Sequence, residues 1–350
     1  MSTVVEQHKK DIRKLTVEEL RTFMSESGEP SYRANQVYEW LWKKSALSFD
    51  EMTNLSKKTR ALLASNFNIP TLHVHQKQIS ADGTIKFSFR LYDGYLIEGV
   101  LIPTEDRITA CISSQVGCSL TCSFCATGYL ERKRNLEPSE LYDQVVQIKK
   151  QSETIYGRPL TNIVLMGMGE PLLNYGNVLK AIDIITSDYG LAMSPKRITL
   201  STAGIAKMIK KLGDDNVKFN LALSLHAAND EKRNKIMPIN ESNSLKALTE
   251  ALIYFYNKTK NKITLEYILF RDFNDSMEDA KQLLEFSRRI PCKVNIIEYN
   301  PIKEAAFVNT TPDKTEKIKA YLEQNDIVVN IRRSRGKDID AACGQLANRN

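Results

Sequence analysis

The segment Cys118-Ser-Leu-Thr-Cys-Ser-Phe-Cys125 brings three of the chain's six cysteines together within eight residues. Chance alone rarely produces such a cluster. A structural zinc site usually has four protein ligands, whereas a [4Fe–4S] cluster held by three thiolates leaves one iron open for another ligand. The segment therefore favours an iron–sulfur cluster. A zinc knuckle, or cysteines buried as small apolar residues, are the alternatives.

Around this segment, apolar strands alternate with helices. A strand at 108–113 precedes the cysteines, and a helix at 138–150 follows them. Further strands are predicted at 162–166, 197–201, 218–225, 262–269, 294–299 and 327–331, with helices that include 277–288 and 312–324. This alternation predicts parallel βαβ units. Roughly six units indicate a full or partial (β/α) barrel, and a doubly wound open sheet is the alternative.

Two smaller parts precede the barrel. Residues 1–70 are predicted to form a helical domain, in which Thr16 and Glu19 make a capping box. Further helices are predicted at 31–44 and from about Ser56, and Pro70 closes the domain.

Residues 71–105 are predicted to form a β-hairpin extension. Its strands lie at 87–91 and 95–102, with type I′ turns at Asp82-Gly83 and Asp93-Gly94. Residues 106–350 then form the barrel and a C-terminal segment.

Composition excludes several classes of protein. With 350 residues, 42% of them apolar, 15 Gly and 11 Pro, the chain is not collagen-like, low-complexity or mostly disordered. A net charge of +7 permits a polyanionic partner. No apolar stretch is long enough to span a membrane, and Met1–Lys14 lacks the apolar core of a secretory signal. We therefore expect a cytoplasmic protein with reduced cysteines.

Polar residues follow four of the predicted strands, and chemistry in parallel sheets gathers at the carboxyl ends of strands. These residues are Gly167-Met-Gly-Glu-Pro171, Ser201, Ser224 with His226, and Asn300. The glycines permit close backbone approach, and Glu170 can accept hydrogen bonds from an ammonium group. Singly, each residue would be a turn, a helix cap or a satisfied core group. Together they predict one cofactor site.

The cysteine spacing, with Phe124 before the third cysteine, resembles the signature of the radical S-adenosylmethionine (SAM) superfamily. Further stretches narrow the resemblance to the RlmN/Cfr family of RNA methyltransferases. They are Ser113–Gly128, Met166–Pro171, Asp338–Leu346 and Glu29–Val37. The resemblance covers nearly the whole chain. It implies an α/β fold: a partial (β/α)6 barrel of the radical SAM type with a small N-terminal helical domain and a short β extension.

The resemblance also implies a role for each matching residue. Cys118, Cys122 and Cys125 fall at the ligands of a [4Fe–4S] cluster. The residues that fall where the family binds SAM are Gly169, Glu170, Ser201, Ser224, Leu225, His226 and Asn300. Three residues fall at catalytic positions: Glu98 at the acid/base, Cys343 at the methyl carrier and Cys111 at the second catalytic cysteine.

The activity that the resemblance implies is methylation of carbon 2 of an adenosine in 23S rRNA and in tRNA. Carbon 2 is not nucleophilic, which is a reason to expect a radical route. In the family's scheme one SAM molecule methylates Cys343, and a second yields a 5′-deoxyadenosyl radical that activates this methyl group. The base becomes covalently tethered to Cys343, and Cys111 releases it by forming a disulfide. An electron donor such as flavodoxin or ferredoxin is implied.

Several alternatives accompany this interpretation. Methylation of carbon 8, as in the Cfr branch, is the nearest one, although Gly169-Glu170-Pro171 is similar to the carbon-2 branch. A non-catalytic RNA-binding protein with a structural zinc ion, and a radical SAM enzyme with a protein or small-molecule substrate, are the others. Without the resemblance, Glu98 would face water by strand alternation, and Cys111 and Cys292 would be core residues.

Basic and aromatic residues predict contacts with RNA. The basic residues flank the proposed site, and they are Arg132, Lys133, Arg134, Arg332, Arg333, Arg335 and Lys337. We expect them to contact phosphates. The helical domain carries Tyr32, Arg33, Trp40 and Trp42. For this domain RNA binding is favoured over simple packing on the barrel.

Overall fold

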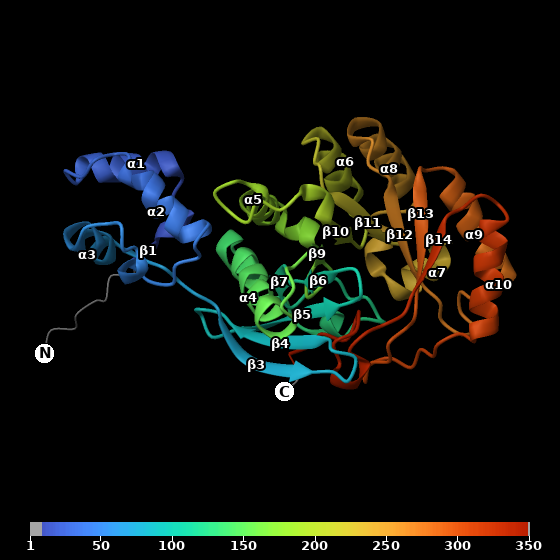
Figure 1. The fold of residues 1–350 in the computed structure, drawn as a ribbon. Coiled ribbons are helices and arrows are strands. Elements are labelled where there is room, and N and C mark those ends of the chain that lie inside the picture. The colour runs from blue at the N-terminus through green and yellow to red at the C-terminus, as the bar shows by residue number, and fades with distance from the viewer. Residues whose placement is uncertain (1–8, 349–350) are drawn as a thin grey trace, which may run out of the picture.

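The computed structural model describes residues 9–348. Most of Met1–Lys14, on which the expectation about a secretory signal rests, therefore lies outside the described residues. Figure 1 shows a helical region at the N-terminus, a small antiparallel sheet and a large region of parallel strands and helices. Within residues 9–348, no helix is long and apolar enough to cross a membrane.

The N-terminal region contains three α-helices. A short parallel pair of strands joins the beginning of this region to its end. These elements are α1 (Val17–Glu26), α2 (Arg33–Trp42), α3 (Lys57–Asn66), β1 (Lys10–Asp11) and β2 (Phe67–Asn68). The predicted capping box is confirmed. The Thr16 hydroxyl accepts from the Glu19 N–H at 3.2 Å, and the Glu19 carboxylate accepts from the Thr16 N–H at 2.7 Å.

The β extension consists of antiparallel strands β3 (His73–Ile79), β4 (Ile85–Arg90) and β5 (Leu96–Pro103). The predicted type I′ turns are wrong. Gly83 and Gly94 have φ values of 83° and 86°, but neither aspartate before them has a positive φ. Each aspartate side chain instead accepts from the N–H two residues on, at Thr84 and Tyr95. This local bond favours a three-residue loop with only the glycine in the left-handed region.

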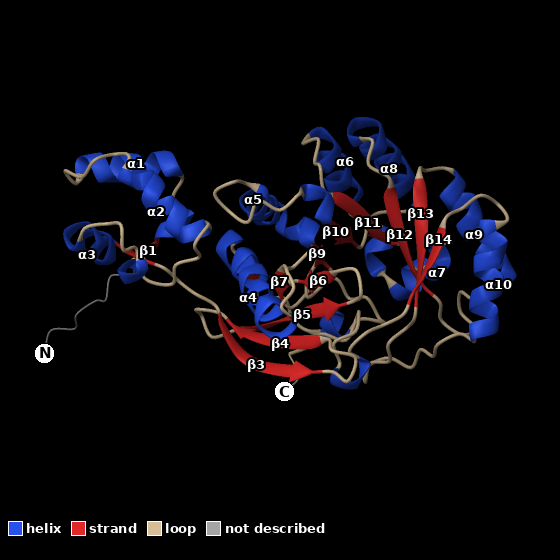
Figure 2. Ribbon diagram, viewed as in Figure 1, coloured by secondary structure: helices blue, strands red, loops and turns tan. Residues whose placement is uncertain are grey.

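The large region continues the same sheet with parallel strands. They are β6 (Ile108–Cys111), β9 (Asn162–Leu165), β10 (Ile198–Thr202), β11 (Asn220–Ser224), β12 (Ile263–Ile268), β13 (Cys292–Ile297) and β14 (Val329–Arg332). The helices are α4 (Pro138–Tyr156), α5 (Tyr175–Thr186), α6 (Ala206–Asp214), α7 (Asp230–Ile236), α8 (Leu245–Thr259), α9 (Met277–Arg288) and α10 (Pro312–Glu323). A short antiparallel pair, β7 (Gln115–Val116) with β8 (Arg134–Asn135), stands apart. Figure 2 shows the helices along the outside of the strands.

Strand order decides between the two predicted architectures. From β6 to β14, leaving aside the separate pair β7 and β8, each strand of the sheet pairs in parallel with the sheet's next strand along the chain, without a reversal. A doubly wound sheet reverses its order at a switch point. The sequential order therefore excludes it and confirms a partial barrel of six strand–helix units followed by β14. All strand carboxyl ends meet at one rim, which is where the predicted site residues lie.

The helical region is fixed to the barrel through α4. Arg13 donates to both carboxylate oxygens of Asp143 at 2.9 Å, and the Tyr142 hydroxyl donates to the Trp42 carbonyl. The rings of Trp42 and Tyr142 meet edge-on at 5.2 Å, and Trp42 is 1% exposed. The expectation that Trp42 contacts RNA is therefore wrong, because its ring is used in packing, whereas Tyr32 is exposed.

The C-terminal segment, residues 336–348, crosses from β14 back to the β extension (Figure 1). The Asp338 carboxylate accepts from the Ser80 hydroxyl and from the Ala81 N–H. At the far end, the Asn348 amide donates to the Leu96 carbonyl at 2.7 Å. These two attachments hold Cys343 between them, over the rim of the barrel.

Candidate active site

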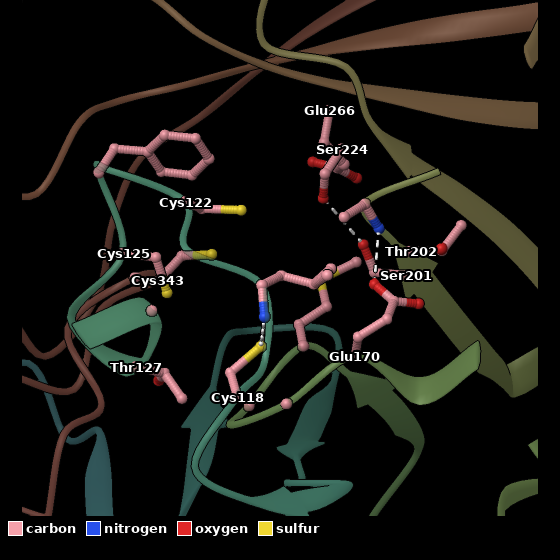
Figure 3. Close-up of a pocket in the computed structure, with 18 of the residues that line it drawn as sticks. Cys118, Cys122, Cys125, Thr127, Glu170, Ser201, Thr202, Ser224, Glu266 and Cys343 are labelled. Atoms are coloured by element: carbon pink, nitrogen blue, oxygen red, sulfur yellow. Dashed lines mark hydrogen bonds between the residues drawn. The ribbon is translucent and has the colours of Figure 1, made fainter. Parts of the chain in front are cut away.

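The cysteine loop lies between β7 and a 3-10 turn at Ala126–Tyr129. Two glycines let it fold tightly. A Cβ on Gly117 would collide with the Glu131 carbonyl, and one on Gly128 would lie 2.8 Å from the Cys122 carbonyl oxygen. Cys118, Cys122 and Cys125 consequently line one cavity (Figure 3).

Burial raises the pKa of all three thiols, that of Cys118 to about 11. The loop therefore holds neutral thiols until a cationic group compensates the thiolate charge. Three soft sulfur donors in a largely apolar cavity fit a [4Fe–4S] cluster. Within the described residues, no three His, Cys, Asp or Glu side chains are arranged to hold a single metal ion. A cluster binds each thiolate through a different iron atom, so it requires wider spacing than a single ion.

The segment after β9 packs directly on the loop that follows β6. A Cβ on Gly167 would lie 2.7 Å from the Ile112 carbonyl oxygen, and one on Gly169, with φ of 95°, would lie 2.5 Å from the Gln115 side chain. Glu170 follows and is 4% exposed. Its carboxylate accepts from the Leu172 N–H at 3.0 Å and from the Ala203 N–H at 2.8 Å, while burial raises its pKa. Glu170 thus joins the ends of β9 and β10 at the edge of the cavity.

The other residues predicted to bind SAM divide into two groups. Gly169, Glu170, Ser201, Ser224 and His226 line the same cavity as the three cysteines, and the hydroxyl oxygens of Ser201 and Ser224 are 3.4 Å apart. Leu225 and Asn300 do not line it.

Asn300 nevertheless lies against the C-terminal segment. It is 3% exposed and donates to the Cys343 carbonyl at 3.1 Å. Its Oδ1 has no hydrogen-bond partner in residues 9–348. An unsatisfied buried acceptor is costly unless a ligand satisfies it, which fits a bound molecule that carries ammonium or hydroxyl donors, as SAM does.

His226 is neutral in this arrangement. Its Nδ1 accepts from the Ile268 N–H at 3.1 Å, its ring meets Phe124 edge-on, and burial lowers its pKa to about 3. An unfolded chain binds a proton at His226 near its ordinary pKa of 6.5. Stability from this group is therefore complete above pH 6.5 and falls as pH drops from there towards 3.

We expect the free energy of unfolding to show this directly. Between about pH 7.5 and pH 5, wild-type protein should lose about 2 kcal/mol more than His226→Gln, since each pH unit below 6.5 contributes about 1.4 kcal/mol. Urea titrations of both proteins at both pH values measure the difference. Equal losses would show that His226 does not titrate as its surroundings indicate.

A second cavity, of about 560 Å³, brings Cys111 and Cys343 together. Cys111 is buried at the end of β6, and Cys343 is exposed on the C-terminal segment, although many protein atoms surround it. Removal from water raises the pKa of Cys111 to about 12 and that of Cys343 to about 11, and Arg332 opposes both shifts. Figure 3 shows Cys343 beside Cys125, so the two cavities meet at this residue.

All six cysteines are free in the structure, including Cys111 and Cys343. The expected disulfide is therefore not a feature of this state.

Glu98 does not line either of these cavities. It is 2% exposed, and its Oε2 accepts from the N–H groups of Ala347 and Asn348 at 2.8 and 3.1 Å. The Lys86 ammonium lies 3.7 Å from its Oε1. Burial raises the pKa of Glu98, and Lys86 acts against this. The simple expectation from strand alternation, that Glu98 faces water, is wrong because the C-terminal segment covers it.

Several of the basic residues predicted to contact phosphates have partners within the protein. Arg332 pairs with Glu266 at 3.2 Å, Lys337 with Glu298 at 2.6 Å, and Arg134 with both Glu140 and Asp93. These ion pairs fix the three charges within the protein, and phosphate contact by these residues stays a prediction.

Arg233 is a residue of the site that sequence reasoning missed. It is fully buried and donates to the carbonyl groups of Leu225, Ala203 and Ser224, which follow or end β10 and β11. Its charge also acts on Cys122. In the sequence it belongs to a run of charged residues in α7, which gives no local sign of burial. Glu266, inside β12, was also missed, although its position in a predicted strand could have indicated it.

Comparison with known proteins shows that the chain is similar to RNA methyltransferases of one family. The family model "Ribosomal RNA large subunit methyltransferase N-terminal domain" matches residues 10–69, and the model "Radical SAM superfamily" matches residues 112–285. A "Probable dual-specificity RNA methyltransferase RlmN" from Cytophaga hutchinsonii is 66% identical over 346 residues, covering 99% of this chain and 95% of the relative. One of the same name from Flavobacterium psychrophilum is 57% identical, covering 97% and 98%.

A solved structure agrees with this likeness. The crystal structure of a radical SAM methyltransferase from Sphaerobacter thermophilus has a TM-score of 0.91 and 38% sequence identity, covering 96% of this chain and 99% of that one. The likeness therefore extends over the helical region, the β extension and the barrel.

Proposed function

Since this chain belongs to the RlmN family of radical SAM RNA methyltransferases, we propose that it methylates carbon 2 of an adenosine in 23S ribosomal RNA and in transfer RNA. The observation that carries the proposal is the meeting of Cys111 and Cys343 in one cavity beside the cysteine loop. Two thiols with no structural disulfide, placed next to a site for a radical cofactor, suit a methyl carrier and its resolving partner.

Cys118, Cys122 and Cys125 would hold the [4Fe–4S] cluster, and Gly169, Glu170, Ser201, Ser224, Leu225, His226 and Asn300 would hold SAM. When bound, these cofactors supply a methyl group and, after reduction by a donor such as flavodoxin or ferredoxin, a 5′-deoxyadenosyl radical; two SAM molecules are used per turnover. The remaining steps depend on the chain's own thiols and carboxylates.

Cys343 receives the methyl group, because its thiol is exposed to the cavity while its backbone is held by Asn300. Arg332 favours its thiolate, the form that acts as a nucleophile. After carbon–carbon bond formation the base is tethered to Cys343 and carries an unpaired electron; it loses this electron, which the bound cluster would take up, and its carbon-2 proton. The Cys111 thiolate then attacks the Cys343 sulfur, the sulfur–carbon bond breaks, and the released carbon takes up a proton to become the methyl group. Arg332 lies close enough to favour the Cys111 thiolate also.

Glu98 accepts the proton that leaves carbon 2. In this conformation its Oε2 is occupied by the two N–H groups of the C-terminal segment. Glu98 lines neither cavity, and the C-terminal segment covers it. We therefore place a movement of residues 347–348 within the reaction.

Residues 1–70 supply further RNA contacts, since Tyr32 is exposed on a domain that is fixed to the barrel. The target base must leave its stack to reach the cavity, so loops or partly unfolded RNA are the preferred substrates. We place the reaction in the cytoplasm, where ribosomal and transfer RNA are found.

Nucleoside mass spectrometry tests the proposal. RNA from cells that express the protein should contain 2-methyladenosine in 23S rRNA and tRNA digests, and RNA from cells without it should lack this nucleoside. The Cys343→Ala variant is the matched control and should restore none. Detection of 8-methyladenosine alone would favour the Cfr-type reaction, and unchanged RNA would reject both.

A further inference from the structure

The interior of the barrel is hollow, and polar side chains line one end of it. In closed (β/α) barrels the inward side chains are mainly branched and apolar and fill the interior. Here the inward positions near the beginnings of the strands are polar: Thr109, Asn162, Thr199, Thr264, Lys293 and Asn330. They line the 560 Å³ cavity that also contains Cys111 and Cys343, and we call this cavity the barrel channel.

The barrel channel runs the length of the strands. Thr264 pairs with Lys293, each the second residue of its strand, and Asn330, the second residue of β14, pairs with Asn295. Cys111 is the last residue of β6 and Arg332 the last of β14, at the opposite end. Lys293 and Asn330 point inward yet are exposed to solvent, as is Arg107 just before β6. The channel therefore opens to solvent at the strand beginnings, away from the rim that carries the cofactor cavity.

The charges in the barrel channel are strongly one-sided. Its charged lining residues are Arg107, Lys293, Arg332, Arg333, Arg335 and Glu266. The single carboxylate is paired with Arg332. Arg107 and Lys293, at the open end, form no ion pair with any of residues 9–348. A narrow cavity of one charge sign concentrates small ions of the opposite sign.

We propose that the barrel channel admits a small anionic thiol, which reduces the Cys111–Cys343 disulfide after each turnover. The inference rests on the proposed function, because only that reaction produces the disulfide. The thiolate of the first molecule attacks one cysteine sulfur, and the other cysteine leaves as a thiolate. A second molecule attacks the mixed disulfide, so that two cysteine thiols and one oxidised external disulfide are formed.

The opening at the strand beginnings gives a reductant a path to the Cys111–Cys343 disulfide that avoids the rim. At the rim, the cysteine loop and the C-terminal segment surround Cys343. A cavity of 560 Å³ excludes a protein reductant but holds a molecule of a few heavy atoms. A small thiol therefore reaches the sulfurs from the strand beginnings, at the end opposite the rim.

Paired small thiols test the route. Holoprotein oxidised with diamide to the Cys111–Cys343 disulfide, verified by peptide mass, is reduced with mercaptoethanesulfonate, which is anionic, or with cysteamine, which is cationic. We expect Lys293→Glu to lower the ratio of the two rates by about threefold or more at low salt, with Lys293→Gln intermediate. Lys281→Glu, on the exposed surface of α9, should leave the ratio unchanged.

Bound substrate RNA provides the second measurement. The proposal places substrate RNA at the rim, so the rate with mercaptoethanesulfonate should stay within about a factor of two when RNA is present. Abolished reduction would show that the thiol enters at the rim or that RNA itself occupies the channel, and would overturn the proposal. An unchanged ratio in Lys293→Glu would overturn it as well.

Failure of the proposed function is distinguishable from failure of this route. If oxidation forms no Cys111–Cys343 disulfide, the release step is wrong. The route is then measured on Cys343→Ala holoprotein by labelling Cys111 with anionic and cationic methanethiosulfonates, read by peptide mass. When Lys293→Glu is combined with Cys343→Ala, the anionic reagent should no longer label Cys111 faster than the cationic reagent. An unchanged ratio of the two labelling rates would reject the channel.

Discussion

Replacement of Cys118, Cys122 or Cys125 by alanine is expected to abolish iron loading and RNA methylation together. The three thiols line one cavity, and the described residues offer no fourth cysteine in the same loop. Two remaining thiolates hold an iron–sulfur cluster poorly, because Cys thiolates are the protein's anchors for it. We expect turnover to fall by about a thousandfold or more, as for other indispensable catalytic groups. Iron analysis, visible absorbance and nucleoside mass spectrometry on anaerobic protein measure both losses.

Cys292→Ala is the matched control for these variants. Cys292 is a half-buried cysteine at the start of β13, and its thiol donates to the Ser287 carbonyl at 3.5 Å. Its replacement should cost about 1 kcal/mol of stability, within the usual range for a small truncation, and leave iron content unchanged. Full methylation by any of the three loop variants would reject the cluster assignment.

Cys111→Ala is expected to stop the reaction after the base has been attached to the protein. Cys343 carries the methyl group and forms the bond to the base, whereas Cys111 only releases it. Without the Cys111 thiolate, the thioether bond between base and Cys343 has no nucleophile in the cavity to break it. A covalent protein–RNA species should therefore accumulate, visible as a nuclease-sensitive shift on a denaturing gel, while multiple turnover falls by about a thousandfold or more.

Two further variants separate the roles of the thiols. Cys343→Ala and the double variant should form no adduct, because no methyl carrier is present. Mass spectrometry should find a methyl group on the Cys343 peptide of wild-type protein and of Cys111→Ala purified without RNA. If Cys111 is merely a core residue, Cys111→Ala should lose about 1 kcal/mol of stability and turn over normally. Normal turnover without a trapped species would remove the resolving role.

The barrel and much of the site could be predicted because their signals are local. Each parallel strand is a short apolar run followed by a turn, and the residues that end these runs, such as Glu170 and Ser201, necessarily meet at one rim. The cysteine loop is likewise contained within eight residues. A pattern of this kind needs no knowledge of distant contacts.

The features that sequence could not reveal depend on partners far away in the chain. Glu98 is buried because the N–H of Ala347, 249 residues later, binds it. Arg332 faces inward because Glu266, two strands away, holds it. Arg233 is buried under strand ends that its own helix does not contain. In each case the neighbours in the sequence do not indicate the distant partner. The environment of these side chains is set only when the sheet has assembled around them.

The hydrogen bond between Glu98 and Ala347 of the C-terminal segment affects the expected order of folding. The parallel strands pair with their chain neighbours, so they form from relatively close contacts, whereas the bond between Glu98 and Ala347 closes a loop that contains the entire barrel. Loop closure of this length is entropically costly and gains little until the barrel exists. We therefore expect the segment that carries Cys343 to dock last during folding and to detach first on local unfolding. On this order, catalytic competence is acquired only in the final folding step, and a chain with a complete barrel can still be inactive.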